Sequence, residues 1–219
     1  MIRQGRSPNP VPAALCAIWA VALIASGIAP YDRATWFMEV LPVLIAAPVL
    51  VATRQRLPLT SLVYALIAVH GLILIYGGAY TYARVPAGYW LQELLGFSRN
   101  PYDRIGHLAQ GFVPAMVARE LMFRVFRIEG RKIVFFLVTC IALAISALYE
   151  LIEWWAALAM GAGADEFLGT QGDVWDTQWD MFLALCGALA AQLLLGRMHD
   201  RQLAGTYSTM TTIGRSHNS

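Results

Sequence analysis

The sequence predicts an all-α protein, a polytopic transmembrane helical bundle of about six spans with both termini in the cytoplasm. Three observations predict this fold. Apolar residues make up 58% of the 219 residues and charged residues only 14%, which lies outside the usual range of soluble domains. Charge-free stretches reach the roughly 20 residues needed to cross the hydrocarbon layer of a bilayer. Arginines collect at the ends of alternate stretches, as the positive-inside rule requires.

Six stretches are expected to span the membrane. No residue between Arg6 and Asp32 is charged, and this run is too long for the apolar core of a cleaved signal peptide. The fourth stretch is unusually polar but has the length of a span. Residues 84–99, with Pro86, Gly88 and the nearby Pro101, are expected to form a loop. The expected spans cover residues 11–28, about 34–53, 59–80, about 103–125, 133–160 and about 179–198.

The orientation follows from the side on which the basic residues collect. In a six-span arrangement most of them fall on the side of the two termini, which is therefore predicted to be cytoplasmic. They are Arg3, Arg6, Arg54, Arg56, Arg124, Arg127, Arg131, Lys132, Arg197 and Arg201. The opposite side is expected to carry an interfacial belt formed by Trp36, Trp90, Trp154, Trp155, Trp175 and Trp179. We expect one transmembrane domain over residues 1–200 and a flexible cytoplasmic tail over residues 201–219.

The composition also argues against several classes of protein. The net charge of +2 is not arranged as the basic stripe that a nucleic-acid partner requires. The three cysteines, Cys16, Cys140 and Cys186, each lie inside an apolar run, so they are expected to act as small apolar residues. The sequence has no internal repeat, which gives no support to an inverted-repeat transporter.

An excess of carboxylates near the outer ends of the last three spans is the main functional signal. From Ile133 to Gly196 there is no lysine or arginine. A carboxylate at membrane depth is costly unless it is protonated, paired or bound to a cation. Six acids are expected around one pocket, with Arg104 as the only nearby cation: Asp103, Glu150, Glu153, Asp173, Asp176 and Asp180. The excess predicts a bound cation or protons.

Helical spacing brings an imidazole to the same place. Asp103, His107 and Gln110 share one face of the fourth span, and Ser146, Glu150 and Glu153 share a face of the fifth. An imidazole with several carboxylates suits a divalent ion such as Mn, Fe, Zn, Mg or Ca. The predicted metal ligands are His107, Glu150, Glu153, Asp176 and Asp180. Residues predicted to orient the ligands or to act as a base are Asp103, Gln110, Asp173, Tyr149 and Gln178.

These residues leave three functional hypotheses open. The first is a metal-dependent hydrolase or transferase acting on a lipid-linked or outer-leaflet substrate. The second is an ion- or proton-coupled transporter, although the middle of spans one, two and six offers few polar side chains to line a route. The third is a structural or assembly protein, in which Arg99 and Arg104 pair with the acids.

Three further features carry narrower predictions. Glu120 lies on another face of the fourth span, one turn from Arg124, and is expected to form a local ion pair with it. His70, alone in an apolar span, is expected to be a hydrogen-bonded packing residue. Residues 169–180, rich in turn formers, amides and acids, are expected to form an ordered loop that folds back over the pocket as a lid or re-entrant segment.

Three motifs carry a resemblance to a known family. They are Tyr102-Asp-Arg-Ile-Gly-His-Leu-Ala-Gln-Gly111, running on to Pro114 and Arg119-Glu120, then Tyr149-Glu-Leu-Ile-Glu-Trp-Trp155, then Leu168-Gly-Thr-Gln-Gly-Asp-Val-Trp-Asp-Thr-Gln-Trp-Asp180. On these residues the chain resembles the YjdF-like family of bacterial inner-membrane proteins, which carries a domain of unknown function. The resemblance covers most of the chain from the second span to the sixth. It implies a multi-pass protein of the inner membrane and brings no established reaction.

Overall fold

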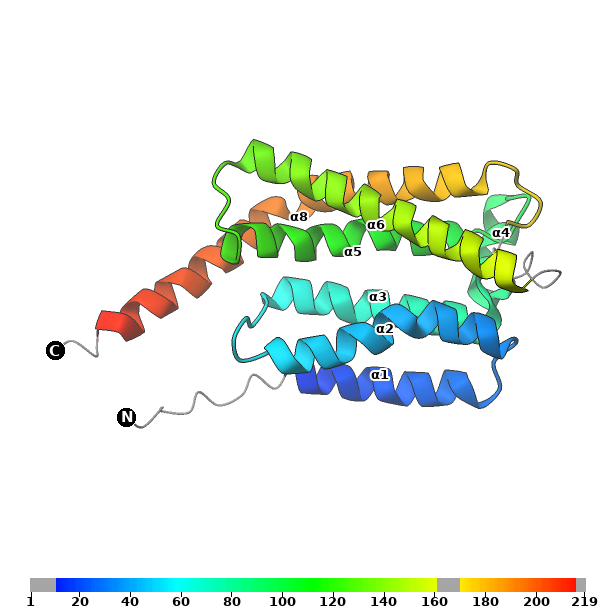
Figure 1. Ribbon diagram of the computed structural model, residues 1–219, viewed down its shortest axis with the longest axis horizontal. Helices are drawn as coiled ribbons and strands as arrows, with labels where there is room; N and C mark the ends of the chain where they lie inside the picture. Colours follow the sequence, from blue (N-terminus) through cyan, green and yellow to red (C-terminus); the bar gives the residue numbers. More distant parts are fainter. Residues whose placement is uncertain (1–10, 161–169, 216–219) are drawn as a thin grey trace.

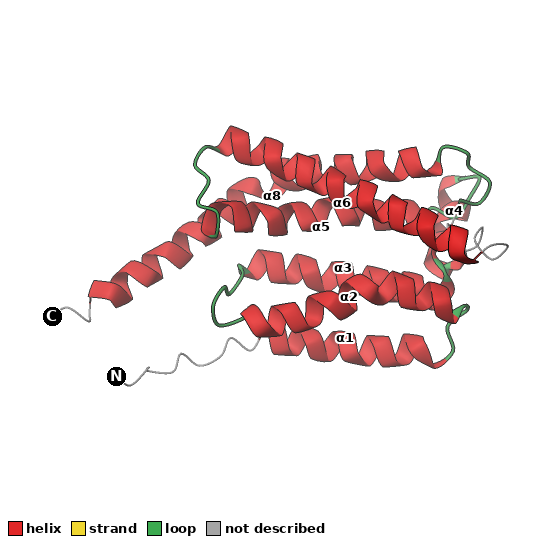
Figure 2. Ribbon diagram, in the orientation of Figure 1, coloured by secondary structure: helices red, strands yellow, loops and turns green. Residues whose placement is uncertain are grey.

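Helices alone make up the secondary structure of residues 11–160 and 170–215, the parts of the chain that the computed structural model describes (Figures 1 and 2). The predicted all-α bundle is confirmed. The α-helices are α1 (Val11–Ile28), α2 (Arg33–Thr53), α3 (Ser61–Tyr80), α4 (Pro86–Leu95), α5 (Tyr102–Arg124), α6 (Arg131–Met160) and α8 (Asp176–Arg215), with a 3₁₀ helix η1 (Tyr82–Arg84) before α4.

Five of these helices are long and apolar enough to cross a membrane by length and composition: α1, α2, α3, α6 and α8. The helix α5 has 23 residues, which is long enough for a span, but it is more polar than the other five. It packs against α3, α6 and α8, so its polar side chains meet other helices rather than lipid. Its place inside the bundle is compatible with a polar span, but that α5 crosses the membrane in addition to the other five helices stays a prediction.

The long helices alternate in direction, and α1 begins at the same end of the bundle where α8 ends (Figure 1). We call this the basic end, because the α2–α3 and α5–α6 connections there carry Arg54, Arg56, Arg127 and Arg131. The opposite end, which holds α4 and the beginning of α8, is the acidic end. That the basic end faces the cytoplasm stays a prediction, as does the division of the chain at residue 200.

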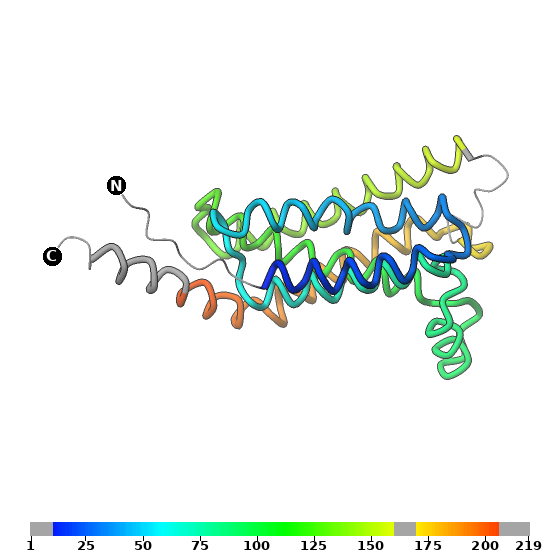
Figure 3. The backbone as a smooth tube through the Cα atoms, turned by 90° about the horizontal axis from the view of Figure 1, so that it is seen from below, coloured from blue at the N-terminus to red at the C-terminus, as the bar shows by residue number. Residues whose placement is uncertain are grey.

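The predicted loop over residues 84–99 is wrong, because most of it forms η1 and α4. Pro86 is the first residue of α4, a position where proline is favoured since its missing N–H has no partner in the first turn. Gly96 ends the helix in the left-handed conformation, with φ of 68°. The same residues that resemble loop signals therefore start and stop a helix, which projects sideways from the bundle (Figure 3).

Two helix starts are fixed by side-chain caps outside the apolar spans. Asp32 precedes α2, and its carboxylate accepts a hydrogen bond from the Thr35 backbone N–H at 2.7 Å. This hydrogen bond holds the pKa of Asp32 below its ordinary value. Thr60 caps α3 in the same way. The bounds of α8 differ from those predicted for the sixth span. The helix begins at Asp176, three residues before the predicted start, and it continues to Arg215, beyond the predicted end at residue 198.

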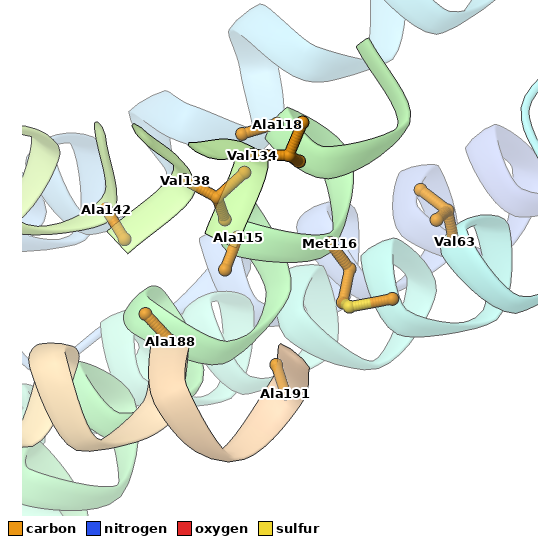
Figure 4. Close-up of a cluster of buried hydrophobic side chains, with 9 residues drawn as sticks. All are labelled: Val63, Ala115, Met116, Ala118, Val134, Val138, Ala142, Ala188 and Ala191. Carbon is orange, nitrogen blue, oxygen red and sulfur yellow. The ribbon is translucent and has the colours of Figure 1, made fainter. Parts of the chain in front are cut away.

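Small residues let α5 approach α8 closely. Ala115, Ala188 and Ala191 are fully buried in a core between α3, α5, α6 and α8 (Figure 4). A Cβ atom at Gly111 would collide with the Ala184 carbonyl, and one at Gly187 would collide with the Leu108 carbonyl. Contact between small residues is the usual means of close helix packing in membranes. The two backbones therefore touch at these glycines, of which Gly111 lies about one turn from His107 and Gly187 about two turns from Asp180.

Candidate metal centre at the acidic end

An imidazole and two carboxylates meet where α5 and α8 begin. His107 Nε2 lies 3.5 Å from Asp103 Oδ1 and 3.8 Å from Asp180 Oδ2. One potential ligand atom from each of the three residues lies within 4.8 Å of the others, and all three side chains are buried. Asp103 and His107 are one turn apart on α5, as the spacing predicted. Asp180 reaches them because the glycine contacts hold α8 against α5.

Each of the three residues has a buried polar atom without a hydrogen-bond partner among the described residues: Asp103 Oδ2, His107 Nδ1 and Asp180 Oδ1. Glu150 Oε1, on α6, is in the same condition and lies 3.8 Å from His107 Nδ1. Leaving a buried polar atom unpaired costs about 1–3 kcal/mol. Of these atoms, His107 Nδ1 and Glu150 Oε1 face each other, whereas Asp103 Oδ2 lies 3.6 Å from Arg99. Buried polar atoms left unpaired in one cluster call for an explanation, and a bound ligand is one.

A cavity of about 140 Å³ adjoins this group on the side of α2 and α3. Glu39, Tyr149 and Glu153 line it, together with Gln110, Tyr82 and His70. The Tyr149 hydroxyl donates to Glu39 Oε2 at 3.4 Å, and its ring meets the His107 ring edge to face, with centroids 6.4 Å apart. The acid-rich pocket thus extends from α8 across α5 and α6 to α2.

Two arginines, not one, face the acids. Arg99 pairs with Asp176 and lies 3.6 Å from both Asp103 and Asp173. Arg104 lies 2.9 Å from Asp173 Oδ2. The predicted count of Arg104 alone is therefore wrong, because Arg99 enters from the α4–α5 connection. Asp173 and Asp176 are held as ion pairs, while Asp103, Glu150 and Asp180 keep buried atoms without hydrogen-bond partners.

The remaining predicted site residues divide between the pocket and the surface. Gln110, Tyr149 and Glu153 line the cavity, whereas Gln178 is exposed and does not reach it. Asp103, predicted to be a supporting residue, lies among the potential ligands. Glu39 was missed. Its position could have indicated a role in the pocket, because Glu39 is a single acid within an otherwise apolar span, about two turns beyond the start of α2.

The described part of the predicted lid, Thr170 onward, is an ordered turn against the start of α5. The Thr170 carbonyl accepts from Arg99 at 3.0 Å. The Gln171 side chain accepts from the Asn100 backbone N–H at 3.1 Å and donates to the Asn100 carbonyl at 3.0 Å. Gly169 lies outside the described residues. The loop therefore folds back onto the α4–α5 connection and carries Asp173 and Asp176 to Arg99.

A second buried cluster lies at the basic end. The predicted ion pair of Glu120 with Arg124 is confirmed, at 2.6 Å. The Glu120 carboxylate also accepts from the Thr60 backbone N–H at 2.9 Å and from the Thr60 hydroxyl at 2.7 Å, and it lies 3.1 Å from His199 Nε2. His199 Nδ1 in turn lies 2.6 Å from Arg119, which also donates to Asp200. The part played by His199 was not predicted.

Fold and site together define a multi-pass helical membrane protein with a buried acid–imidazole centre at one end of its bundle. The chain belongs to the family described as "Predicted membrane protein (DUF2238)", which it matches over residues 11–201. It is 62% identical over 181 residues to the inner membrane protein YjdF of Escherichia coli (strain K12), covering 83% of this chain and 87% of that protein. No solved structure matches the chain. The expected family and location in the bacterial inner membrane are confirmed.

Proposed function

We propose that the acid–imidazole pocket binds a divalent metal ion and that the protein hydrolyses, or transfers a group from, the headgroup of a lipid-linked substrate. The observation that carries this proposal is the meeting of Asp103, His107 and Asp180 within 4.8 Å. One imidazole nitrogen and two carboxylate oxygens would supply three ligands, the number typical of catalytic sites that keep a position open. Glu150, 3.8 Å from the imidazole, is placed to hold or orient the ring.

The charge balance supports a cation rather than further ion pairs. Arg99 and Arg104 are committed mainly to Asp173 and Asp176, which leaves Glu39, Glu150 and Asp180 without an arginine among the described residues. A bound divalent ion would offset part of this charge and would polarise a phosphoryl or acyl oxygen or activate a water molecule. Glu153 and Glu39, across the cavity, are candidates to accept a proton during such a reaction.

The shape of the cavity supports a lipid-linked substrate. An apolar crevice of about 480 Å³ continues from the acidic pocket toward the basic end, between α1, α2 and α3 on one side and α5 and α6 on the other. The two cavities share five lining residues, namely Pro42, His70, Leu74, Pro114 and Ile145. A headgroup at the acids with an apolar tail in the crevice would match this change in polarity.

The crevice does not favour the transporter hypothesis. A transported ion would need polar partners between the acidic pocket and the basic end. Apart from His70 and Thr53, the crevice is lined by apolar residues such as Val43, Ile67 and Val117. The polar pocket therefore ends within the bundle.

Metal analysis of the full-length protein in detergent tests the first part of the proposal. The protein is supplied with Mn²⁺, Fe²⁺, Zn²⁺ and Mg²⁺ in turn, and bound metal is measured by elemental analysis. One of these ions should bind stoichiometrically, and His107→Ala and Asp180→Asn should each weaken its binding by about tenfold or more. Gln178→Ala, on an exposed amide of the same helix, is the matched control and should bind as the wild type does. Absence of binding for all four ions would overturn the proposal.

Product analysis tests the second part. Metal-loaded protein is incubated with a total polar lipid extract of bacterial inner membrane, and products are identified by mass spectrometry. Product should appear with the wild type and be absent with Asp180→Asn or with chelator. Ala46→Phe, which fills the crevice at a distance from the ligands, should retain the metal and lose the product. Metal binding without any product would contradict the enzymatic part and leave a structural metal site.

A further inference from the structure

A second, chemically opposite cavity lies at the basic end. It has a volume of about 750 Å³ and is bounded by the α2–α3 connection, the α5–α6 connection and α8. Four arginines line it: Arg56, Arg124, Arg127 and Arg131. Two acids, Glu129 and Asp200, also line it, so the lining carries a net positive charge.

The four arginines are not equivalent. The guanidinium of Arg124 is held by Glu120 and by the Pro58 carbonyl, and Arg131 pairs with Asp200, which Arg119 also contacts. Arg56 and Arg127 are exposed, and with the described side chains of residues 11–159 and 170–205 they form no ion pair. Glu129 is the one lining acid that no described arginine holds. The charges of Arg124 and Arg131 are therefore balanced by Glu120 and Asp200, whereas the guanidinium groups of Arg56 and Arg127 remain available to a ligand.

The backbone around Arg127 adds to the positive character. Arg127 has a φ of 53° and Gly130 a φ of 97°, so the α5–α6 connection curls tightly before α6 begins at Arg131. For a non-glycine residue this left-handed conformation costs about 1–2 kcal/mol. The first turn of the 30-residue α6 contains no acid and begins Arg131-Lys132, although the positive end of a helix dipole favours anions. Among the described residues, Asp200 offsets the charge of Arg131 and the neighbouring Glu129 is the other acid at this helix start, so the positive charge is only partly balanced.

Apolar side chains also line the cavity, namely Leu57, Phe123, Ile128 and Leu203. Val125 and Phe126, next to Arg127, are 49% and 62% exposed at the end of an intramembrane helix. Side chains of this type belong in hydrocarbon, and arginines beside them belong at the level of the lipid phosphates. The cavity thus opens at the depth where a phospholipid headgroup lies.

We infer that this cavity binds the phosphate of an anionic phospholipid headgroup, with Arg56 and Arg127 as the principal ligands. Guanidinium groups bind phosphate oxygens bidentately, and basic pockets between membrane helices are a recurrent place for acidic lipids. A free phosphate would satisfy the arginines but would leave the apolar part of the lining, Leu57, Phe123, Ile128 and Leu203, without a partner. This inference does not depend on the metal site, because the two cavities share no residue.

The test uses the full-length protein in non-ionic detergent, titrated with dioleoyl phosphatidylglycerol or dioleoyl phosphatidylcholine and followed by native mass spectrometry. The wild type should bind the phosphatidylglycerol at least about tenfold more tightly than the phosphatidylcholine. The Arg56→Gln/Arg127→Gln double variant should lose this preference. Glu129→Gln, which removes the opposing charge, should strengthen phosphatidylglycerol binding. Melting temperatures of all variants should match the wild type, since none of these side chains has a described ion-pair partner.

A matched control separates a pocket from general surface charge. Arg201→Gln removes an exposed arginine of α8 that does not line the cavity, and it should leave phosphatidylglycerol binding within about twofold of the wild type. An equal loss in Arg201→Gln, or equal binding of the two lipids, would overturn the inference. Displacement of the lipid by millimolar inorganic phosphate would assign the site to a soluble anion and refute the lipid as its ligand.

Discussion

The two buried polar clusters of the bundle differ in how completely their groups find partners. At the basic end, the Glu120 carboxylate accepts three hydrogen bonds from Thr60 and Arg124 and faces His199. At the acidic end, Asp103, His107 and Asp180 each keep a buried atom without one. Both clusters are buried to a similar degree. Burial therefore does not distinguish the structural ion pair from the proposed ligand site, and the two differ instead in how many of their buried polar atoms have partners.

A substitution in the cluster around Glu120, whose polar groups have partners, should have the largest effect on stability. Glu120→Ala leaves Arg124, His199 and Thr60 without their shared acceptor, and removal of one member of a buried ion pair costs about 3–5 kcal/mol. Unfolding of the purified protein in mixed detergent micelles measures this change. Glu129→Ala, an exposed acid at the same end, serves as the control and should be nearly neutral. A loss below about 1 kcal/mol in Glu120→Ala would contradict a structural role.

The glycine contact between α5 and α8 should rank second. Gly111→Ala places a methyl group against the Ala184 carbonyl, and overpacking of this kind costs about 1–3 kcal/mol. Because the same contact positions Asp180 against His107, metal binding should fall together with stability. Gly205→Ala is the matched control on α8, since a Cβ atom there meets nothing within 4 Å. Unchanged unfolding and metal binding in Gly111→Ala would show that the helices separate without penalty.

Asp32, which lies outside the membrane, shows how much a hydrogen-bonded carboxylate at a helix start contributes to stability. Asp32→Ala removes the cap of α2 and should cost about 1 kcal/mol near neutral pH. Since the Thr35 N–H lowers the pKa of Asp32 in the folded state, the stabilisation is complete above about pH 4 and is lost as the pH falls further. Unfolding of wild type and variant at several pH values measures their difference. A difference that grows on acidification would contradict this assignment.

A substitution in the acidic cluster of Asp103, His107 and Asp180 should have the smallest effect on stability. In the presence of chelator, Asp180→Asn removes one of several neighbouring negative charges and breaks no described hydrogen bond of Asp180. Its stability should stay within about 1 kcal/mol of the wild type, although the proposed metal binding should weaken. The same unfolding assay measures this, and His107→Ala provides a second variant of the cluster. A loss as large as that of Glu120→Ala would identify Asp180 as a structural residue and remove the contrast between the two ends.

Much of the fold could be predicted from where charges interrupt the apolar stretches. Asp32 and Arg131 lie next to the observed helix starts because a charge marks the edge of the hydrocarbon layer. The shared face of Asp103 and His107 could also be predicted, because they lie one turn apart on the same helix. Residues 84–99 could not, since proline at the first position of a helix looks like proline in a loop. Single-sequence spacing does not distinguish the two.

Contacts between residues on different helices could not be predicted from the spacing of residues in the sequence. Glu120 and Arg124 lie on one helix and were paired correctly, but His199 is 79 residues from Glu120 and was missed. Arg99 was left out of the charge count although it lies only four residues before Asp103; only its contact with Asp176, 77 residues away, lay outside what spacing indicates. Glu39 belongs to the first half of the chain and reaches the pocket only through the packing of α2 against α3. Each of these long-range contacts depends on the crossing of helices, which a linear pattern does not contain.

The glycines between α5 and α8 would have a consequence for the size of ion that the proposed metal site accepts. Where two main chains touch, their separation is fixed by atomic radii, and no change of rotamer can widen it. The carboxylates of Asp103 and Asp180 project from these two helices about two turns from Gly111 and Gly187. Ligands that project from two helices at a fixed separation would not move apart for a large ion such as Ca²⁺, whose flexible sites take six to eight oxygens. Size discrimination would then reside in Gly111 and Gly187, which never touch the ion.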